Sequence, residues 1–267
     1  MPTTPMLDVR GVNKSFGAVH VLRDVNFTAN AGEVTALVGD NGAGKSTLIK
    51  CIGGIYSADS GQYLFDGKQV TIHTPRDASD LGIEIVYQDL ALCDNLDVVQ
   101  NMFLGREKVR RGVLDEPTME QMAADTLERL SVRTVKSMRQ LVASLSGGQR
   151  QTVAIAKAVL WNGRLVILDE PTAALGVAQT AQVLELVRQL ADNGLCVVLI
   201  SHNMNDVFAV ADSIATLYLG QMAAQLKASD VTFSQVVELI TAGRSGELGL
   251  TPAAAANHGG TMNGAQA

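Results

Sequence analysis

One nine-residue stretch, residues 39–47, restricts the folds open to this chain more than any other part of it. It reads GDNGAGKST and fits the pattern G-x-x-x-x-G-K-[ST] of a phosphate-binding P-loop. Glycines allow backbone N–H groups to approach a polyphosphate, and the N-terminus of the following helix attracts the same anion. The alternative is a glycine-rich turn that binds nothing. The lysine argues against that alternative, as do the strand predicted before the loop (EVTALVG) and the helix predicted after it (STLIKCIGG).

The P-loop therefore predicts a nucleoside triphosphate as ligand. Lys45 would supply a mobile positive charge to the β- and γ-phosphates, and the Ser46 hydroxyl would bind Mg²⁺. The residues that we expect to contact the nucleotide here are Gly39, Asn41, Gly42, Gly44, Lys45, Ser46 and Thr47.

Size and composition are those of a folded chain without features of export. The chain has 267 residues, a net charge of −6 and three widely separated cysteines, so no disulfide pattern is predicted. The acidic balance disfavours a general role in nucleic-acid binding. The N-terminal segment lacks the layout of a signal peptide, and the longest apolar runs are far shorter than the ~20 residues that cross a bilayer. We therefore expect a soluble protein in a reducing cytoplasm.

The pattern along the chain predicts an α/β fold. Residues 7–16 and 21–29 alternate apolar and polar side chains, as antiparallel strands do, and residues 61–70 read as a hairpin that turns at Asp66–Gly67. Residues 165–170 and 195–201 are almost wholly apolar, which is typical of strands buried on both faces of a parallel sheet. Further strands are expected at 82–88 and in a hairpin, 213–228, through Gly220–Gln221; helices are expected at 75–81, 177–191, 204–211 and 232–242.

The middle of the chain has helical spacing instead, in residues 95–107, 118–130 and 147–161. In the second of these, one helical face carries an apolar stripe that we interpret as core: Met119, Met122, Ala123, Leu127 and Leu130. We predict one domain over residues 1–245, with a mostly parallel P-loop NTPase core (1–88 and 160–245), an antiparallel β subdomain and an inserted helical subdomain (about 89–159). Residues 246–267 are expected to form a disordered tail.

Two acids follow the strand LVILD. Asp169 ends this run, close to where the P-loop is expected to lie, and would hold Mg²⁺ directly or through water. Glu170 is placed to polarise an attacking water. Ordinary solvated acids at a strand end are the alternative, and the P-loop in the same chain argues against it.

The stretch LSGGQRQ, residues 145–151, resembles the signature motif of the ATP-binding-cassette (ABC) family. On physical grounds Ser146 is a good helix N-cap, and the two glycines expose N–H groups at a second anion-binding helix terminus. The resemblance covers residues 7–242 and implies that this segment binds the γ-phosphate of ATP held by a partner subunit. A purely structural N-cap is the alternative. The residues implied in this contact are Ser146, Gly147, Gly148 and Gln149.

The resemblance implies roles for three further residues. Gln88 matches the glutamine that senses Mg²⁺ and water, and His202 matches the histidine that contacts the γ-phosphate. Phe16 matches the aromatic residue that stacks on adenine, although an aromatic at this position could instead belong to the core. One position departs from the family pattern: the chain has Gly176 where most members carry an aspartate that helps two subunits communicate.

The segments PTAALGV and VYQDLALCDNLDVVQNMFLGRE are similar to those of monosaccharide importer ATPases for ribose, galactose, xylose or fructose. This implies a homodimer around two Mg·ATP, at the cytoplasmic face of the inner membrane, that drives integral membrane permease subunits and acts indirectly with a sugar-binding protein. We expect the permease near Gln88 and residues 89–104, where part of an apolar set could form a docking surface: Leu90, Leu92, Leu96, Val98, Val99, Met102 and Phe103.

Other functions stay open from the sequence. They are a soluble ABC-type ATPase in DNA repair or translation, a catalytically idle interaction module, an exporter, and an importer ATPase for a substrate other than sugar. No coiled coil, zinc module or tandem cassette supports the first, and intact Lys45, Asp169 and Glu170 argue against the second.

Overall fold

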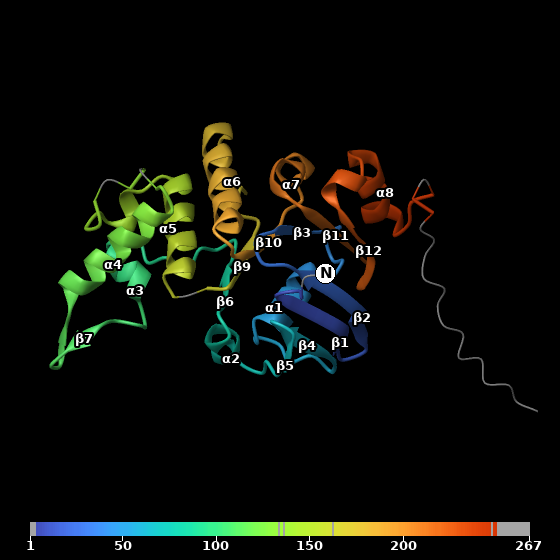
Figure 1. Cartoon of the computed structure of the whole chain (residues 1–267), viewed down its shortest axis with the longest axis horizontal. Coiled ribbons are helices and arrows are strands. Elements are labelled where there is room, and N and C mark those ends of the chain that lie inside the picture. The colour runs from blue at the N-terminus through green and yellow to red at the C-terminus, as the bar shows by residue number, and fades with distance from the viewer. Residues whose placement is uncertain (1–3, 133, 136, 162, 247, 250–267) are drawn as a thin grey trace, which may run out of the picture.

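The computed structural model describes residues 4–132, 134–135, 137–161, 163–246 and 248–249. They form a six-stranded and a four-stranded sheet with a helix between them, and a group of helices with a two-stranded hairpin to one side (Figure 1). No helix within this part of the chain has the length and apolar character needed to cross a membrane. The predicted disordered tail falls almost entirely outside the described residues.

A six-stranded sheet carries the nucleotide-binding motifs, in the order β12-β11-β3-β10-β9-β6. Five neighbouring strands are parallel, and only β12 runs antiparallel, as the last arm of a hairpin with β11. The prediction of a mostly parallel sheet is confirmed. Its strands are β3 (Val34–Val38), β6 (Ile83–Val86), β9 (Leu165–Asp169), β10 (Cys196–Ile200), β11 (Ser213–Tyr218) and β12 (Gln221–Lys227).

The apolar run of β9 shows why this sheet needs cover on both faces. Leu165 and Ile167 belong to the core beside helix α1 (Lys45–Ile52), whereas Val166 and Leu168 belong to the core beside helix α6 (Val177–Asp192). Successive side chains of a strand point to opposite faces, so an apolar residue at every position requires apolar neighbours on both sides.

Helix α1 lies between the parallel sheet and a second, antiparallel sheet of order β2-β1-β4-β5 (Figure 1). Leu48, Ile49 and Ile52 of α1 are at most 1% exposed and share one core cluster with both sheets. The predicted antiparallel subdomain is thereby confirmed. Its strands are β1 (Leu7–Phe16), β2 (Val19–Ala29), β4 (Ser60–Phe65) and β5 (Lys68–Val70).

Helices α3, α4 and α5 form the group to one side, and α5 also packs against α6 (Figure 1). The predicted apolar stripe of α4 is buried in their shared core, with Met122 only partly covered. The helices beyond α1 and α6 are α2 (Pro75–Asp80), α3 (Val98–Phe103), α4 (Glu116–Arg129), α5 (Gly147–Leu160), α7 (Met204–Val210) and α8 (Phe233–Ala242), with short 3-10 turns η1 (Val142–Ser144) and η2 (Ala228–Asp230).

Three details of the sequence interpretation were wrong. The helix expected over residues 95–107 is only α3, because Asp97 caps it and the chain leaves the helix at Leu104. Sequence reasoning missed the hairpin β7 (Val109–Arg110) and β8 (Val113–Leu114) that follows. The β11–β12 hairpin turns at Leu219 and Gly220, whose positive φ angles of 45° and 82° suit a two-residue turn.

Four of the seven apolar residues that were expected to provide core and part of a docking surface are core. Val98, Val99, Met102 and Phe103 are at most 1% exposed, because α3 packs them against α5 and its neighbours. Leu90, Leu92 and Leu96 are half-buried. Only these three could contribute to a docking surface, which stays a prediction.

The buried position of α1 predicts that its apolar side chains dominate stability. Ile49→Ala should lower the free energy of unfolding by about 2–5 kcal/mol, because the cavity opens between two sheets that cannot both collapse into it. Urea denaturation measures this loss. Val177→Ala is the control, since Val177 is 91% exposed and should change stability by less than about 0.5 kcal/mol. Equal effects of the two substitutions would contradict the assignment of α1 to the core.

Candidate functional site

The P-loop joins β3 to α1, and two of its glycines have no substitute. At Gly39 (φ 153°) an added Cβ would collide with the backbone carbonyl of Leu217. At Gly44 (φ 107°), the N-cap of α1, an added Cβ would lie 2.9 Å from a methyl of Leu22. The loop is thus pressed against its neighbours on one side, which leaves its other side open to a ligand.

Lys45, the first residue of α1, is folded back onto this loop. Its Nζ donates to the carbonyl oxygens of Gly39 at 2.7 Å and Asp40 at 3.0 Å. Burial lowers the pKa of Lys45, although the charges of Glu170, Asp40 and Asp169 oppose this. The ammonium group is therefore desolvated, held by two carbonyls, and surrounded by acids.

A pocket of about 490 Å³ brings the separate motifs together at the carboxyl ends of β3, β6 and β9. P-loop residues 41–47 line one side of it. Gln88, Asp169 and Glu170 line its remaining polar side, and Val21 and Ile200 its apolar side. The pocket thus brings together three segments with predicted site residues: the P-loop, Gln88 and Asp169–Glu170.

The negative charge of Asp169 in this pocket is only partly balanced by nearby positive charges. Burial raises the pKa of Asp169, and the neighbouring negative charge of Glu170 raises it further, while Lys45 and Lys50 act in the opposite direction. The described residues contain no cluster of three or more His, Cys, Asp or Glu side chains suited to a metal. Ser46, Gln88 and Asp169 instead offer oxygen atoms beside the P-loop, a donor set that fits Mg²⁺ shared with phosphates.

Glu170 is held in an unusual backbone conformation immediately after β9. Its φ is 50°, a left-handed value that is uncommon for a residue with a side chain, and its N–H donates to the carbonyl of Ile200. Its carboxylate oxygen Oε2 lies 2.8 Å from His202 Nδ1. The two candidate catalytic side chains therefore contact each other across the ends of β9 and β10.

Sequence analysis missed a small polar network that fixes the His202 segment. Asp206, only 6% exposed, accepts from Thr172 Oγ1 at 2.6 Å and from Asn203 Nδ2 at 3.1 Å. This network connects the loop after Glu170 to the first turn of α7. An acid four residues beyond His202, at a predicted helix start, was the available signal.

Gly176 begins α6 as its N-cap, in an ordinary extended conformation (φ −74°, ψ 162°). A Cβ added there would meet nothing within 4 Å. Neither space nor backbone conformation therefore requires glycine at the position where the family pattern has aspartate.

The signature residues lie outside the P-loop pocket. Ser146 caps α5 and forms a capping box with Gln149, whose side-chain amide also donates to Thr134 O at 2.6 Å. Gly147 and Gly148 pack against α6 residues and its preceding loop, with Leu175 and Gln179 as nearest neighbours. The N-terminus of α5 is thus formed within the single chain, but it does not face that chain's own P-loop pocket.

Phe16 also lies outside the lining of the P-loop pocket. Its ring is 42% exposed and meets Tyr56 edge-on, with ring centroids 5.1 Å apart. Its exposure rejects the alternative that Phe16 belongs to the core.

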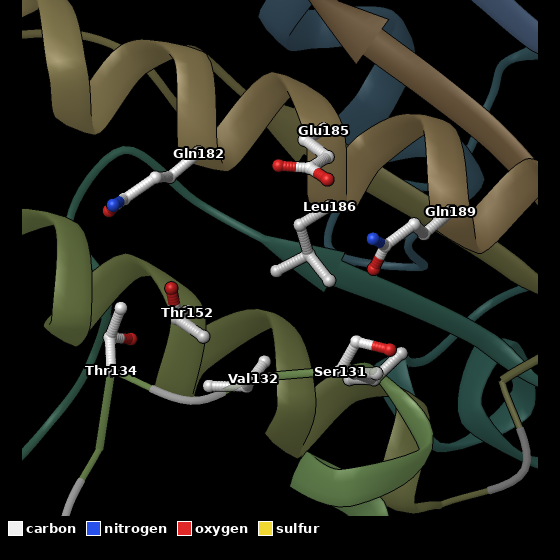
Figure 2. Close-up of a pocket in the computed structure, with 9 residues that line it drawn as sticks. Ser131, Val132, Thr134, Thr152, Gln182, Glu185, Leu186 and Gln189 are labelled. Carbon is white, nitrogen blue, oxygen red and sulfur yellow. The ribbon is translucent and has the colours of Figure 1, made fainter.

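A second pocket, of about 350 Å³, separates α5 and the α4–α5 connection from α6 (Figure 2). Gln182, Leu186 and Gln189 project from α6 toward Ser131 and Thr152 on the opposite side, and Glu185 lies along α6 (Figure 2). Among the described residues, its lining is mostly polar and carries one acid, Glu185.

Comparisons with known proteins show the family of the chain. The family model described as "ABC transporter" matches residues 22–173. The chain is 43% identical to the xylose/arabinose import ATP-binding protein XylG of Sulfolobus acidocaldarius, over 92% of this chain and 97% of the relative. It is 43% identical to the fructose import ATP-binding protein FrcA of Rhizobium meliloti, over 90% of this chain and 95% of the relative.

Other relatives are longer. The ribose import ATP-binding protein RbsA of Chromobacterium violaceum is 40% identical over 90% of this chain but only 47% of its own length. Among solved structures, a nucleotide-free ATP-binding cassette of an ABC transporter covers 88% of this chain at 26% identity, with a TM-score of 0.76, and 98% of that structure is matched. An ADP-bound cassette covers 90% of this chain at 26% identity, with a TM-score of 0.75 and 96% of its own length matched.

The raised pKa of Asp169 predicts opposite effects of one substitution on stability and on metal binding. Because this pKa is higher in the folded chain than in the unfolded one, ionisation at neutral pH destabilises the fold. Asp169→Asn should therefore raise the melting temperature of the nucleotide-free protein by roughly 1–3 °C. In the same variant, the addition of Mg²⁺ should no longer raise the affinity for ATP.

Differential scanning fluorimetry and nucleotide titration with and without Mg²⁺ measure the two effects. Asp80→Asn is the control, because that carboxylate is 75% exposed on α2 and far from the pocket lining. A fall in melting temperature for Asp169→Asn would contradict the inference that the ionised Asp169 carboxylate destabilises the nucleotide-free fold.

Proposed function

The chain belongs to the ABC transporter family of ATPases, and from this premise we propose that it is the ATP-hydrolysing subunit of a sugar importer. The observation that carries the sugar assignment is its 43% identity, over nearly the whole length of both chains, to import ATP-binding proteins named for xylose/arabinose and fructose. The alternatives in DNA repair, translation or export have no comparable support among these relatives.

ATP binding is assigned to the P-loop pocket. The backbone of Gly42 and Gly44 and the N-terminus of α1 would receive the phosphates, with Asn41 and Thr47 beside them. Lys45 would exchange its hydrogen bonds to the carbonyls of Gly39 and Asp40 for hydrogen bonds to phosphate oxygens. Its buried ammonium group would then have a negatively charged partner. Phe16, exposed at the end of β1, is assigned to the adenine ring.

Mg²⁺ would be held by Ser46 and Asp169, with Gln88 in reach, and would neutralise the charge of the β- and γ-phosphates. This also supplies the positive charge that Asp169 lacks in the nucleotide-free chain.

Hydrolysis is assigned to Glu170, acting on a water molecule, with His202 at the γ-phosphate. In the present structure the two side chains contact each other, Nδ1 to Oε2, at 2.8 Å. Nucleotide binding would draw His202 toward phosphate and release the Glu170 carboxylate for the water. The backbone of Glu170 keeps its carboxylate at the rim of the pocket throughout.

A second copy of the chain is proposed to complete each site. The N-terminus of α5, with Ser146, Gly147, Gly148 and Gln149, has the structure of an anion site but does not line its own P-loop pocket. In a two-fold dimer each α5 N-terminus would face the partner's γ-phosphate. Closure then excludes water and positions the charges, which accounts for most of the catalysis.

The proposed partners follow from the import role. Integral membrane permease subunits would bind beside Gln88 and Asp89, both exposed, and a sugar-binding protein would deliver the cargo to them. The chain would then lie at the cytoplasmic face of the cell membrane. Residues 1–245 form the proposed nucleotide-binding domain, with the helical subdomain over about 89–159.

Mixing two inactive variants tests the shared site. Lys45→Ala removes the P-loop charge, and Ser146→Arg blocks the α5 N-terminus. Each variant alone should lack activity. A mixture should recover about a quarter of the wild-type phosphate release, because half of the dimers are mixed and each has one complete site. A mixture as inactive as its components, despite dimerisation with ATP, would place both halves of the site in one chain.

Sugar-dependent ATP hydrolysis tests the import assignment. The chain is reconstituted in proteoliposomes with its permease and sugar-binding protein, and phosphate release is measured with xylose, arabinose, fructose and ribose. We expect one of these sugars to stimulate hydrolysis severalfold. Glu170→Gln is the control, and it should bind ATP while losing at least about 100-fold in turnover. A complex that forms but responds to none of the sugars would contradict the assignment.

A further inference from the structure

The β7–β8 hairpin is the most exposed continuous part of the described chain outside its ends. All eleven residues from 104 to 114 are exposed. Val109 pairs with Leu114 and Arg110 with Val113, and the turn residues Arg111 and Gly112 both have positive φ, at 53° and 82°. The hairpin projects beyond α4 at the far end of the helical group (Figure 1).

The base of this hairpin is firmly attached. Arg106 forms an ion pair with Glu84 at 3.1 Å and donates to Ser79 Oγ at 2.7 Å. Arg106 and Lys108 both lie over the ring of Trp161, at 5.2 and 5.5 Å from its centroid. A two-stranded hairpin is marginal by itself, so these contacts are what hold its tip in place.

The tip combines positive charge with apolar side chains. Residues 106–111 contain four basic side chains and one acid, in a chain whose net charge is −6. Arg110 and Arg111 form no ion pair with any described residue. Between and beside them Val109, Val113 and Leu114 are 61%, 70% and 52% exposed. The hairpin therefore presents uncompensated cations together with apolar surface that nothing covers.

We propose that the β7–β8 hairpin is a membrane-surface contact that binds anionic lipid headgroups. Interleaved basic and apolar side chains are the composition of segments that lie in the bilayer interface, where cations meet phosphates and short apolar side chains enter the acyl boundary. A nucleic acid would match the cations but not the three apolar side chains. The hairpin is too short to insert further than the interface.

The position of the hairpin agrees with this partner, in a step that rests on the proposed function. Through Arg106, its base is tied to α2 and to β6, the strand that leads to Gln88. A permease bound beside Gln88 would thus hold the hairpin near the bilayer surface. Contact with lipid there would hold the helical group at the membrane while the permease changes conformation.

Vesicle flotation with the full chain tests the proposal without ATP or permease, so its outcome is separate from that of the proposed function. We expect the chain to float with phosphatidylcholine vesicles that contain phosphatidylglycerol, and not with phosphatidylcholine alone. Raising the salt concentration should weaken the binding. The double variant Arg110→Ser/Arg111→Asn should lower the partition coefficient at least about tenfold; Asn is chosen because it tolerates the positive φ of residue 111.

The matched control removes the same charge elsewhere. Arg23→Ser/Arg129→Ser changes two exposed arginines away from the hairpin and should leave the partition coefficient within about twofold of wild type. Unchanged ATPase activity and melting temperature show that both variants are folded. Absence of binding, equal binding to neutral vesicles, or an equal loss in the control would overturn the proposal. So would displacement of the chain from vesicles by duplex DNA, which would indicate a general polyanion site.

Discussion

The burial of α1 between two sheets is the constraint on which the rest of the structure depends. A P-loop must keep several N–H groups pointed at one anion, which requires that the helix behind it cannot move. Here the helix has apolar partners on both sides, from the parallel sheet and from the antiparallel one. Gly39 and Gly44 then allow the loop to lie against Leu217 and Leu22. The rigidity of the phosphate site is thus a property of two sheets rather than of the loop itself.

The electrostatics of the pocket are arranged for a ligand that the folded chain does not contain. Lys45 is desolvated and held by carbonyls, and Asp169 carries a charge that burial and Glu170 disfavour. Such a site is less stable empty than an apolar pocket of equal size would be. Under the proposed function, a magnesium–nucleotide complex would supply both missing partners at once, and its binding would therefore stabilise the site.

Much of this could be predicted from the sequence, and the exceptions have physical causes. The strands and the P-loop follow from local pattern, since apolar runs and glycine spacing directly determine them. The convergence of Gln88 and Asp169 on the P-loop follows from the carboxyl ends of parallel strands meeting at one edge. The Glu170–His202 contact and the Asp206 network could not be predicted, because they depend on loop geometry between strands. The β7–β8 hairpin was missed because its strands have two residues each, too few for periodicity.

Trp161 is the only tryptophan of the chain, and its place at the base of the hairpin gives the protein a built-in optical probe. The indole meets Phe103 of α3 edge-on, lies at the end of α5, and has two cationic side chains over its ring. Any rotation of the helical group that separates these elements changes the polarity around one fluorophore. The tryptophan emission of the unlabelled protein therefore reports on the joint between that group and the hairpin, because no second tryptophan contributes to it.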